Sequence, residues 1–306
     1  MTDDQRPDSP PMPPPEGGSA EGSSPPVPAA AGEPAPKASK AGRNLPVAIA
    51  VGAGLLGLVA VSLIFAKWIF AIVGVAAVWL GVVEISKAMR TQHIRIAREP
   101  ILLSLPIIGF VAYQGGAVGH LVSIASLVLV VLLFRLTFGV DHYVRDTSGS
   151  IFVVAYLPLM LGFAILSLSA ENGAWLIATY ILLTVGSDIG GYAAGVLFGK
   201  HPMAASISPK KSWEGFAGSV ITQMVIGALL FQYALDAVWW QGVIVGVAMT
   251  VTATLGDFVE SAIKRDLGVK DMGDIVPGHG GIMDRLDSLI PNAFVSWAFF
   301  AWFLGI

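Results

Sequence analysis

Long apolar segments recur along this chain from residue 45 to the C-terminus, and they constrain its fold more than any other feature. A bilayer has a hydrocarbon core of about 30 Å, which an α-helix crosses in roughly 20 residues. The mean hydropathy of +0.72 agrees with a chain that lies mostly in such a core. We therefore expect an all-α polytopic membrane protein with about nine transmembrane helices, at residues 45–66, 68–86, 100–114, 117–137, 150–169, 174–197, 215–235, 238–256 and 289–305.

The first 43 residues differ in kind from the rest. Eleven of the 19 prolines lie there, among Gly, Ser, Ala and Glu, and large apolar side chains are almost absent. Such a segment buries too little apolar surface to offset the entropy that it would lose on ordering. We expect residues 1–43 to form a disordered cytoplasmic tail without the features of a signal peptide, and residues 44–306 to form the transmembrane domain.

The distribution of Lys and Arg predicts the orientation. With nine spans, 17 of the 18 Lys and Arg residues fall on one side of the membrane, and Lys67 falls on the other. By the positive-inside rule, the side rich in these residues is the cytoplasm. We thus expect a multi-pass protein of the inner (plasma) membrane whose N-terminus is cytoplasmic and whose C-terminus is outside. The net charge of −3 gives no reason to expect a nucleic-acid partner, and the absence of cysteine excludes disulfides and thiolate metal sites.

Charged residues gather in the last cytoplasmic loop, although only 13% of the chain is charged. Asp257, Ser261 and Lys264 fall at i, i+4 and i+7, with Glu260 and Arg265 beside them. A helix that continues from the eighth span would therefore present a carboxylate, a hydroxyl and a cation on one face. We interpret this face as one wall of a polar site.

The second wall comes from the segment before the last span. "DRLDS" places Asp284 and Asp287 at i and i+3, again on one helical face, and "PGHGG" at residues 277–281 supplies a tight turn whose N–H groups can converge on an anion. Mg²⁺ prefers carboxylate and phosphate oxygens as ligands. The two walls therefore predict Mg²⁺-dependent phosphoryl or nucleotidyl transfer. The alternative is a solvated loop whose charges only obey membrane topology.

A second polar constellation lies one cytoplasmic loop earlier. Asp188 falls inside the sixth span, where an ionisable residue is costly and indicates function, unless it lies close enough to the cytoplasmic end to stay hydrated. The four glycines between residues 190 and 199 are typical of helix packing. "SPKK" places Lys210 and Lys211 either on a triphosphate or at the membrane surface as an anchor, and the spacing leaves both interpretations open. Glu84, near the inner end of the second span, is interpreted as interfacial.

The stretch "SAIKRDLGVKDMGDIVPGHGGIMDRLD", residues 261–287, resembles the signature of the phosphatidate cytidylyltransferases, also called CDP-diglyceride synthases. The preceding "GDFVES" and the upstream "SPKKSWEG" are similar to that family as well, so the resemblance covers a catalytic region of about residues 186–290. The first five spans resemble the family only in hydropathy. Departures at Gly191, Ser212 and Val276 remove no charged or metal-binding candidate.

The resemblance implies a nucleotidyltransferase of phospholipid biosynthesis, which converts CTP and phosphatidic acid into CDP-diacylglycerol and pyrophosphate. It implies Mg²⁺ and a metal centre with more than one cation, held by Asp257, Asp284 and Asp287, which together with Lys264 form the catalytic group. It assigns substrate binding to Ser261, Arg265, Lys210, Lys211, Asp188, His279, Gly280, Gly281 and Arg285. No base is required, because the phosphate nucleophile of the lipid is already ionised near pH 7.

The resemblance also implies a helical bundle that forms a homodimer, into which membrane lipid slides sideways while CTP arrives from the cytosol. Rival functions of two classes stay open: another CTP-using membrane enzyme and a secondary transporter. A CTP-dependent polyprenol or dolichol kinase would transfer the γ-phosphate, and a related enzyme would transfer cytidylyl to an isoprenoid lipid phosphate. A secondary transporter would show repeated halves and charge at the membrane midplane, and the sequence has no such repeat.

Overall fold

This computed structural model describes residue 54 and residues 57–204, 208–273 and 281–306, and most of these residues are helical. The helices are α2 (Lys67–Thr91), α3 (Arg98–Leu136), α4 (Tyr143–Tyr156), α5 (Pro158–Ser169), α6 (Gly173–Phe198), α7 (Trp213–Tyr233), α8 (Trp239–Asp266), α9 (Met283–Leu286) and α10 (Leu289–Leu304). Residues 57–65 are helical as well. The predicted all-α fold class is confirmed.

Six helices in the described ranges are long and apolar enough to cross a membrane: α2, α3, the consecutive α4 and α5 counted as one, α6, α7 and α8. The predicted count of nine is therefore not confirmed. The tail at 1–43 and most of the first predicted span lie outside the described residues, so the division of the chain at residue 43 stays a prediction. The ninth predicted span corresponds to α10, which is 16 residues long.

The third and fourth predicted spans both fall in α3, which is 39 residues long and reverses direction near its middle. Gly116 has non-helical backbone angles, φ 61° and ψ −156°, which glycine adopts without steric cost. A Cβ added at Gly119 would lie 2.9 Å from the carbonyl oxygen of Val111. In a straight helix these residues would be separated by about 12 Å along the axis. The two halves of α3 therefore fold back on each other at the predicted boundary.

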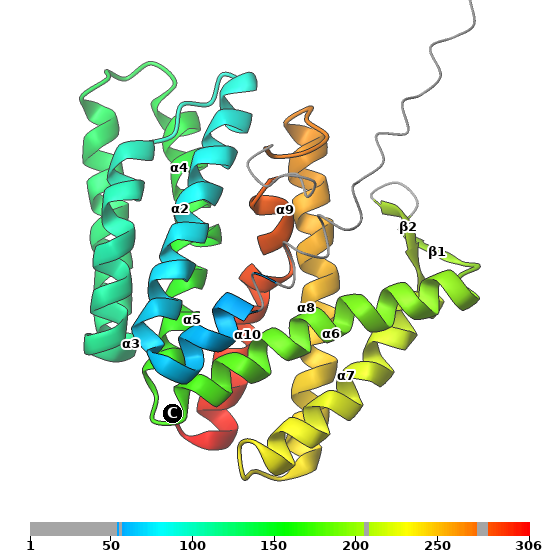
Figure 1. Cartoon of the computed structure of the whole chain (residues 1–306). Coiled ribbons are helices and arrows are strands. Elements are labelled where there is room, and N and C mark those ends of the chain that lie inside the picture. The colour runs from blue at the N-terminus through cyan, green and yellow to red at the C-terminus, as the bar shows by residue number, and fades with distance from the viewer. Residues whose placement is uncertain (1–53, 55–56, 205–207, 274–280) are drawn as a thin grey trace, which may run out of the picture. The chain divides into compact units, whose positions relative to one another are not determined.

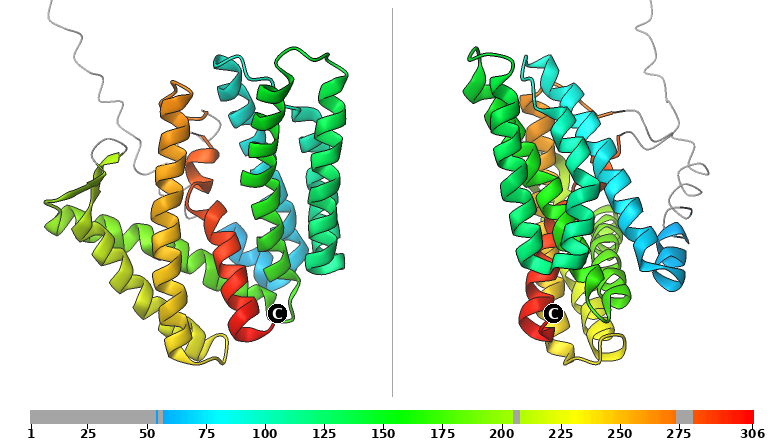
Figure 2. Two further views of the ribbon diagram at one scale, coloured as in Figure 1. Left: turned by 180° about the vertical axis from the view of Figure 1, so that it is seen from behind. Right: turned by 90° about the vertical axis from the view of Figure 1, so that its left-hand side faces the viewer.

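The helices form two packed groups with α10 between them (Figure 1; Figure 2). One buried apolar cluster lies mainly among α2, α3, α4 and α5. A second lies mainly among α6, α7, α8 and α10, where Phe231 and Phe300 are fully buried. Because α10 packs against both α5 and α8, the segment that precedes it runs along the boundary between the two groups.

Small residues bring α7 very close to its two neighbours. A Cβ added at Gly190 in α6 would lie 2.4 Å from the hydroxyl of Thr222, and one added at Gly246 in α8 would lie 2.4 Å from a backbone oxygen of α7. The interpretation of the α6 glycines as packing positions is confirmed at Gly190. This close packing fixes α6 and α8 relative to each other, and these helices carry Asp188 and Asp257.

A short antiparallel hairpin, β1 (Pro202–Ala204) and β2 (Ser208–Ser212), connects α6 to α7. The sequence pattern predicts no strand here. Proline has no N–H group to donate within a helix, and it is tolerated at the edge of a sheet. The hydroxyl of Ser212 accepts a hydrogen bond from the N–H of Gly215 at 3.1 Å and so caps the start of α7. The hairpin carries Lys211 toward α8.

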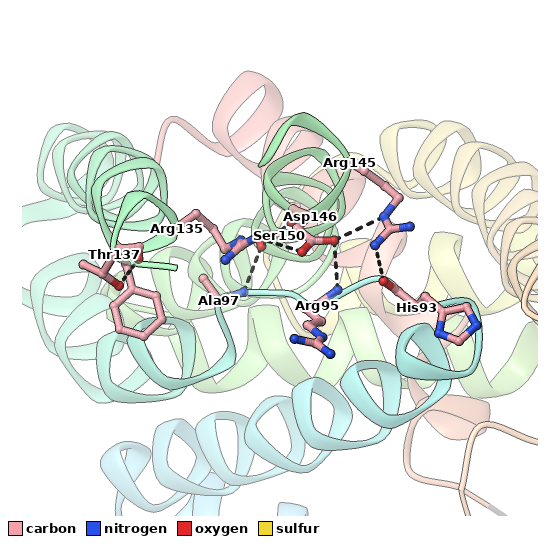
Figure 3. A network of polar contacts seen from close by, with 9 residues as sticks. His93, Arg95, Ala97, Arg135, Thr137, Arg145, Asp146 and Ser150 are labelled. Carbon is pink, nitrogen blue, oxygen red and sulfur yellow. Dashed lines mark hydrogen bonds and ion pairs between the residues drawn. The ribbon is translucent and has the colours of Figure 1, made fainter. Parts of the chain in front are cut away.

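A buried polar network joins α3, α4 and the loop after α2 (Figure 3). Asp146 is 2% exposed and accepts hydrogen bonds from the guanidinium groups of Arg135 at 2.8 Å and Arg145 at 3.3 Å. It also accepts one from the backbone N–H of Arg95 at 3.1 Å. We call these four residues the Asp146 network.

The ends of α2 and α8 also meet. The hydroxyl of Thr91 donates a hydrogen bond to the carbonyl oxygen of Leu267 at 3.1 Å. Together with the bond from Arg95 to Asp146, this contact brings three of the positively charged loops to one end of the helices. That arrangement agrees with the prediction that these loops lie on the same side of the membrane.

Candidate active site

The acidic residues of α8 face the acidic residues around α9 in antiparallel order. Asp257 lies beside Asp287, and two turns later along α8 Lys264 forms an ion pair with Asp284 at 2.8 Å. α8 therefore runs from Asp257 to Lys264 while the facing segment runs from Asp284 to Asp287. The helical spacings predicted from the sequence produce this alignment, and four of the predicted catalytic residues meet in one place.

Asp257 and Asp287 are close enough for their carboxyl groups to share a hydrogen bond. Gly256 permits this approach, because a Cβ there would lie 2.4 Å from the carbonyl oxygen of Asp287. Burial, and after it the charges of Asp257 and Glu260, raise the pKa of Asp287 well above its usual value. Two carboxylates held this close repel each other unless a proton or a cation lies between them.

Asp284 is stabilised as a carboxylate. Burial would raise the pKa of Asp284, but hydrogen bonds with Glu260 and Lys264 and one from the N–H of Gly281 hold that pKa below its usual value. The bond from Gly281 measures 2.9 Å, and Lys264 also contacts Glu260 at 2.7 Å. Asp284 therefore stays charged near neutral pH and lies next to a fixed cation.

Lys211 reaches the site from β2. Its ammonium group forms an ion pair with Asp257 and lies 5.1 Å from the centre of the Phe258 ring. Both side chains of the ion pair are partly exposed, 28% for Lys211 and 22% for Asp257. Lys211 is therefore held at the acidic cluster by a carboxylate and an aromatic face while it remains accessible to a ligand.

Two cavities of different character meet at Asp188 and Asp257, which line both. The first, of about 420 Å³, lies between α6, α7, α8 and the hairpin, and its lining includes Ser187, Lys211, Ser212 and Ser219. The second, of about 620 Å³, lies between α2, α5, α6, α10 and residues 282–290, and it is lined mostly by apolar side chains. A more polar and a more apolar compartment thus open onto the same carboxylates.

A metal ion would need ligands from both the protein and a substrate. Among the described side chains, no three His, Asp or Glu residues converge closely enough to hold a metal ion by themselves. Mg²⁺, however, is commonly bound through one or two carboxylates together with substrate phosphates and water. The close pair Asp257 and Asp287 fits such a cation, because its charge would remove their mutual repulsion.

The remaining predicted site residues are placed less completely. Ser261 is half-buried on α8 one turn after Asp257, and Arg265 is exposed near the end of that helix. Arg285 lines the apolar cavity. The side chain of Lys210 and the residues His279 and Gly280 lie outside the described part of the chain.

Two neighbours of the site are missed by the sequence analysis. Glu84 is buried, at 1% exposure, and its carboxylate contacts the segment before α9, so the interpretation of this residue as interfacial is wrong. The hydroxyl of Tyr156 is buried without a hydrogen-bond partner among the described residues, within electrostatic range of Glu260, Asp287 and Asp257. An acidic residue within a predicted span was the one available signal for Glu84.

Comparisons with known proteins cover nearly the whole chain. The sequence pattern of the cytidylyltransferase family matches residues 46–303. The phosphatidate cytidylyltransferase of Mycobacterium leprae (strain TN) is 38% identical over 274 residues, which are 84% of this chain and 88% of that protein. That of Mycobacterium tuberculosis (strain H37Rv) is 37% identical over 279 residues, 87% of this chain and 85% of the relative. That of Staphylococcus haemolyticus is 30% identical over 217 residues, 69% and 83% of the two chains.

Proposed function

The chain belongs to the cytidylyltransferase family, and from this premise we propose that it is a phosphatidate cytidylyltransferase. Its substrates are CTP and phosphatidic acid, and its products are CDP-diacylglycerol and pyrophosphate. Relatives that bear this name share 37–38% of their residues with this chain over most of both lengths. The protein is therefore an enzyme of phospholipid synthesis.

The observation that carries this proposal is the meeting of two unlike cavities at one acidic cluster. A reaction between a water-soluble nucleotide and a lipid needs a polar compartment and an apolar compartment that share the reacting centre. The cavity beside Lys211 suits the phosphates and base of CTP. The apolar cavity beside α2 and α5 suits the acyl chains of phosphatidate, with the lipid phosphate at Asp188, Asp257 and Arg285.

The side chains act by alignment and charge neutralisation. A phosphate oxygen of phosphatidate attacks the α-phosphorus of CTP, and the bond from that phosphorus to the bridging oxygen breaks, which releases pyrophosphate. The lipid phosphate is already ionised near pH 7, so no protein base has to remove a proton. Lys211 and Lys264 are fixed by carboxylates at the site and lie where they can offset the charge that moves onto pyrophosphate.

The family indicates a divalent cation, and we propose Mg²⁺. A bound Mg²⁺ would supply Lewis-acid stabilisation of the phosphate oxygens. Asp257, Asp284 and Asp287 are the proposed ligands, and the pair Asp257 and Asp287 would hold one ion between them. Asp284 would be a ligand of a second cation. Ser261, Arg265, Lys210 and the turn with His279, Gly280 and Gly281 are proposed to bind the phosphates of CTP or lipid.

The apolar helices are those of a membrane protein, and the distribution of charge supports an orientation. We propose the inner membrane as its location, with the site and the N-terminus facing the cytoplasm and the C-terminus outside. CTP then reaches the site directly from the cytosol. We further propose a homodimer, as the family resemblance implies.

Incubation of purified protein with Mg²⁺, phosphatidic acid and CTP labelled separately at the α- and γ-phosphates tests the function. Label from the α position should enter the lipid, and label from the γ position should leave as pyrophosphate. Transfer of γ label to an added polyprenol would instead identify a lipid kinase. Omission of the divalent cation should abolish transfer, and restoration with Mg²⁺ should recover it.

A further inference from the structure

Glu84 belongs to α2, far in sequence from the acidic cluster, yet it contacts the segment that begins α9. One carboxylate oxygen of Glu84 accepts a hydrogen bond from the N–H of Ile282 at 3.0 Å, and the other accepts one from the N–H of Met283 at 2.9 Å. Glu84 is 1% exposed and Met283 is fully buried. The carboxylate therefore has two backbone donors as partners in a place that water does not reach.

Two glycines leave the space that this carboxylate occupies. A Cβ added at Gly273 would lie 2.4 Å from one oxygen of Glu84, and a Cβ added at Gly281 would lie 2.7 Å from the other. Real Cβ atoms essentially never approach this closely, so any larger residue at either position would displace the carboxylate. Glu84 is thus enclosed by the described residues on either side of segment 274–280.

The N–H groups that Glu84 binds lie directly beside catalytic candidates. Met283 is adjacent to Asp284, and the N–H of Gly281 donates to the carboxylate of Asp284 at 2.9 Å. The first N–H groups of a helix have no partner within it, so a helix as short as α9 depends on outside acceptors for its position. The two carboxylate oxygens of Glu84 supply these acceptors. The two bonds fix the position of Asp284 opposite Lys264.

We propose that Glu84 is a positioning residue for the cytidylyl transfer: its carboxylate holds the backbone of residues 281–283 so that Asp284 meets Lys264 and the substrate phosphates. The inference rests on the proposed function for the reaction that it serves. Groups that orient the ligands of a reacting centre typically change affinity or rate 10- to 100-fold when they are altered. A residue that only stabilised the fold would leave the turnover of the folded enzyme unchanged.

The variant Glu84→Gln tests this role, because it keeps the shape of the side chain but replaces one acceptor with an amide that faces an N–H group. We expect kcat for CDP-diacylglycerol formation to fall about 10- to 100-fold while KM for CTP changes less than about threefold. We also expect amide hydrogen exchange in a peptide covering residues 281–288 to accelerate at least about tenfold, because either Ile282 or Met283 loses the acceptor of its N–H group.

Asp146→Asn is the matched control, since Asp146 is also a buried carboxylate that accepts a backbone N–H. It should lower thermal stability but leave kcat per folded molecule and exchange at residues 281–288 unchanged. The proposal is overturned if Glu84→Gln leaves that exchange unchanged, or if its kcat falls no more than in the control.

If Glu84→Gln does not fold, Gly273→Ala tests the same contact, because its added Cβ would displace the carboxylate of Glu84. Gly273→Ala should reproduce the loss of kcat and the faster exchange. Gly115→Ala should change neither, because its Cβ would lie 3.9 Å from its nearest neighbour, a methyl group of Val111. Normal turnover in Gly273→Ala would overturn the proposal. Absence of cytidylyl transfer by the unaltered protein would refute the proposed function alone, because the exchange measurement still reports whether Glu84 holds this segment.

Discussion

The Asp146 network and the acidic cluster around Asp257 both contain buried carboxylates, but they differ in how many cations and donors each carboxylate has as partners. Asp146 has two guanidinium groups and a backbone N–H as partners, so one carboxylate faces an excess of donors. In the cluster, Asp257 and Asp287 face each other, and Glu260 and Asp284 share a single Lys264. Protein groups alone compensate the charge of Asp146, whereas Asp257 and Asp287 place two carboxylates against each other.

The difference separates a structural role from a functional one. Burying a charge is costly unless partners compensate it, so a network that exists only for stability is expected to be fully paired. A site that binds cations and phosphates has to leave carboxylates and lysines available to them. The excess of carboxylates in the cluster therefore costs stability in the free protein and favours ligand binding.

Asp284→Asn should give the largest effect. It removes the negative charge that Lys264 and the proposed cation both contact, and it removes little packing, so we expect activity to fall at least about 100-fold. The rate of CDP-diacylglycerol formation and the thermal denaturation temperature of the purified variant are the measurements. Retention of activity at ordinary Mg²⁺ concentrations would contradict the metal assignment.

Ala77→Phe should have a smaller and more selective effect. Ala77 lines the apolar cavity, so a phenyl ring there should raise KM for long-chain phosphatidate about tenfold and leave KM for dihexanoyl phosphatidate nearly unchanged. Ala76→Phe, at an exposed position of the same helix, is the control and should change neither value. An equal increase for both lipids would show that the cavity does not hold the acyl chains.

Asp146→Asn should have the opposite effect to Asp284→Asn, with a loss of stability and little loss of activity. Removal of one partner from a buried ion pair typically costs about 3 kcal/mol, so the variant should denature at a lower temperature or concentration of denaturant. The specific activity of the folded fraction should stay within about twofold of the original, because the described lining of the two cavities includes no residue of the network. A loss of turnover without a loss of stability would remove the distinction between the two regions.

Deletion of residues 1–40 should change activity least. The acidic cluster and the described lining residues of both cavities come from residues 59–293, so transfer of cytidylyl should continue at nearly the original rate. Activity of the shortened protein in detergent, compared with that of the full chain, is the measurement. Loss of most turnover would assign the tail a part in catalysis that nothing in its composition predicts.

Local spacing allowed the sequence to predict which residues share each of the two walls of the site. Asp257 and Lys264 share a helix face, and Asp284 and Asp287 share another, because the helical period relates residues three, four and seven positions apart. The reversal at Gly116 also coincides with a predicted boundary between spans. These features depend on residues close together in the chain.

Long-range contacts could not be predicted in the same way. Whether Glu84 faces lipid, water or protein depends on which segment packs against α2, and its partners Ile282 and Met283 follow nearly 200 residues later. The ion pair of Arg135 with Asp146 depends likewise on how α3 and α4 meet. The hairpin β1–β2 was missed because three- and five-residue strands give too little periodicity to distinguish them from a loop.

The hydrogen bonds that the start of α9 donates to Glu84 of α2 have a consequence for how the protein is made. Synthesis proceeds from the N-terminus, so Glu84 enters the membrane long before Met283 has been translated. Until then its carboxylate has to take water or other polar groups as partners. Residues 282–287 then donate two N–H groups to Glu84 and also bring Asp284 and Asp287 to the site. A nascent chain therefore has no assembled reaction centre until residues 281–287 have been translated and have packed against α2 and α8.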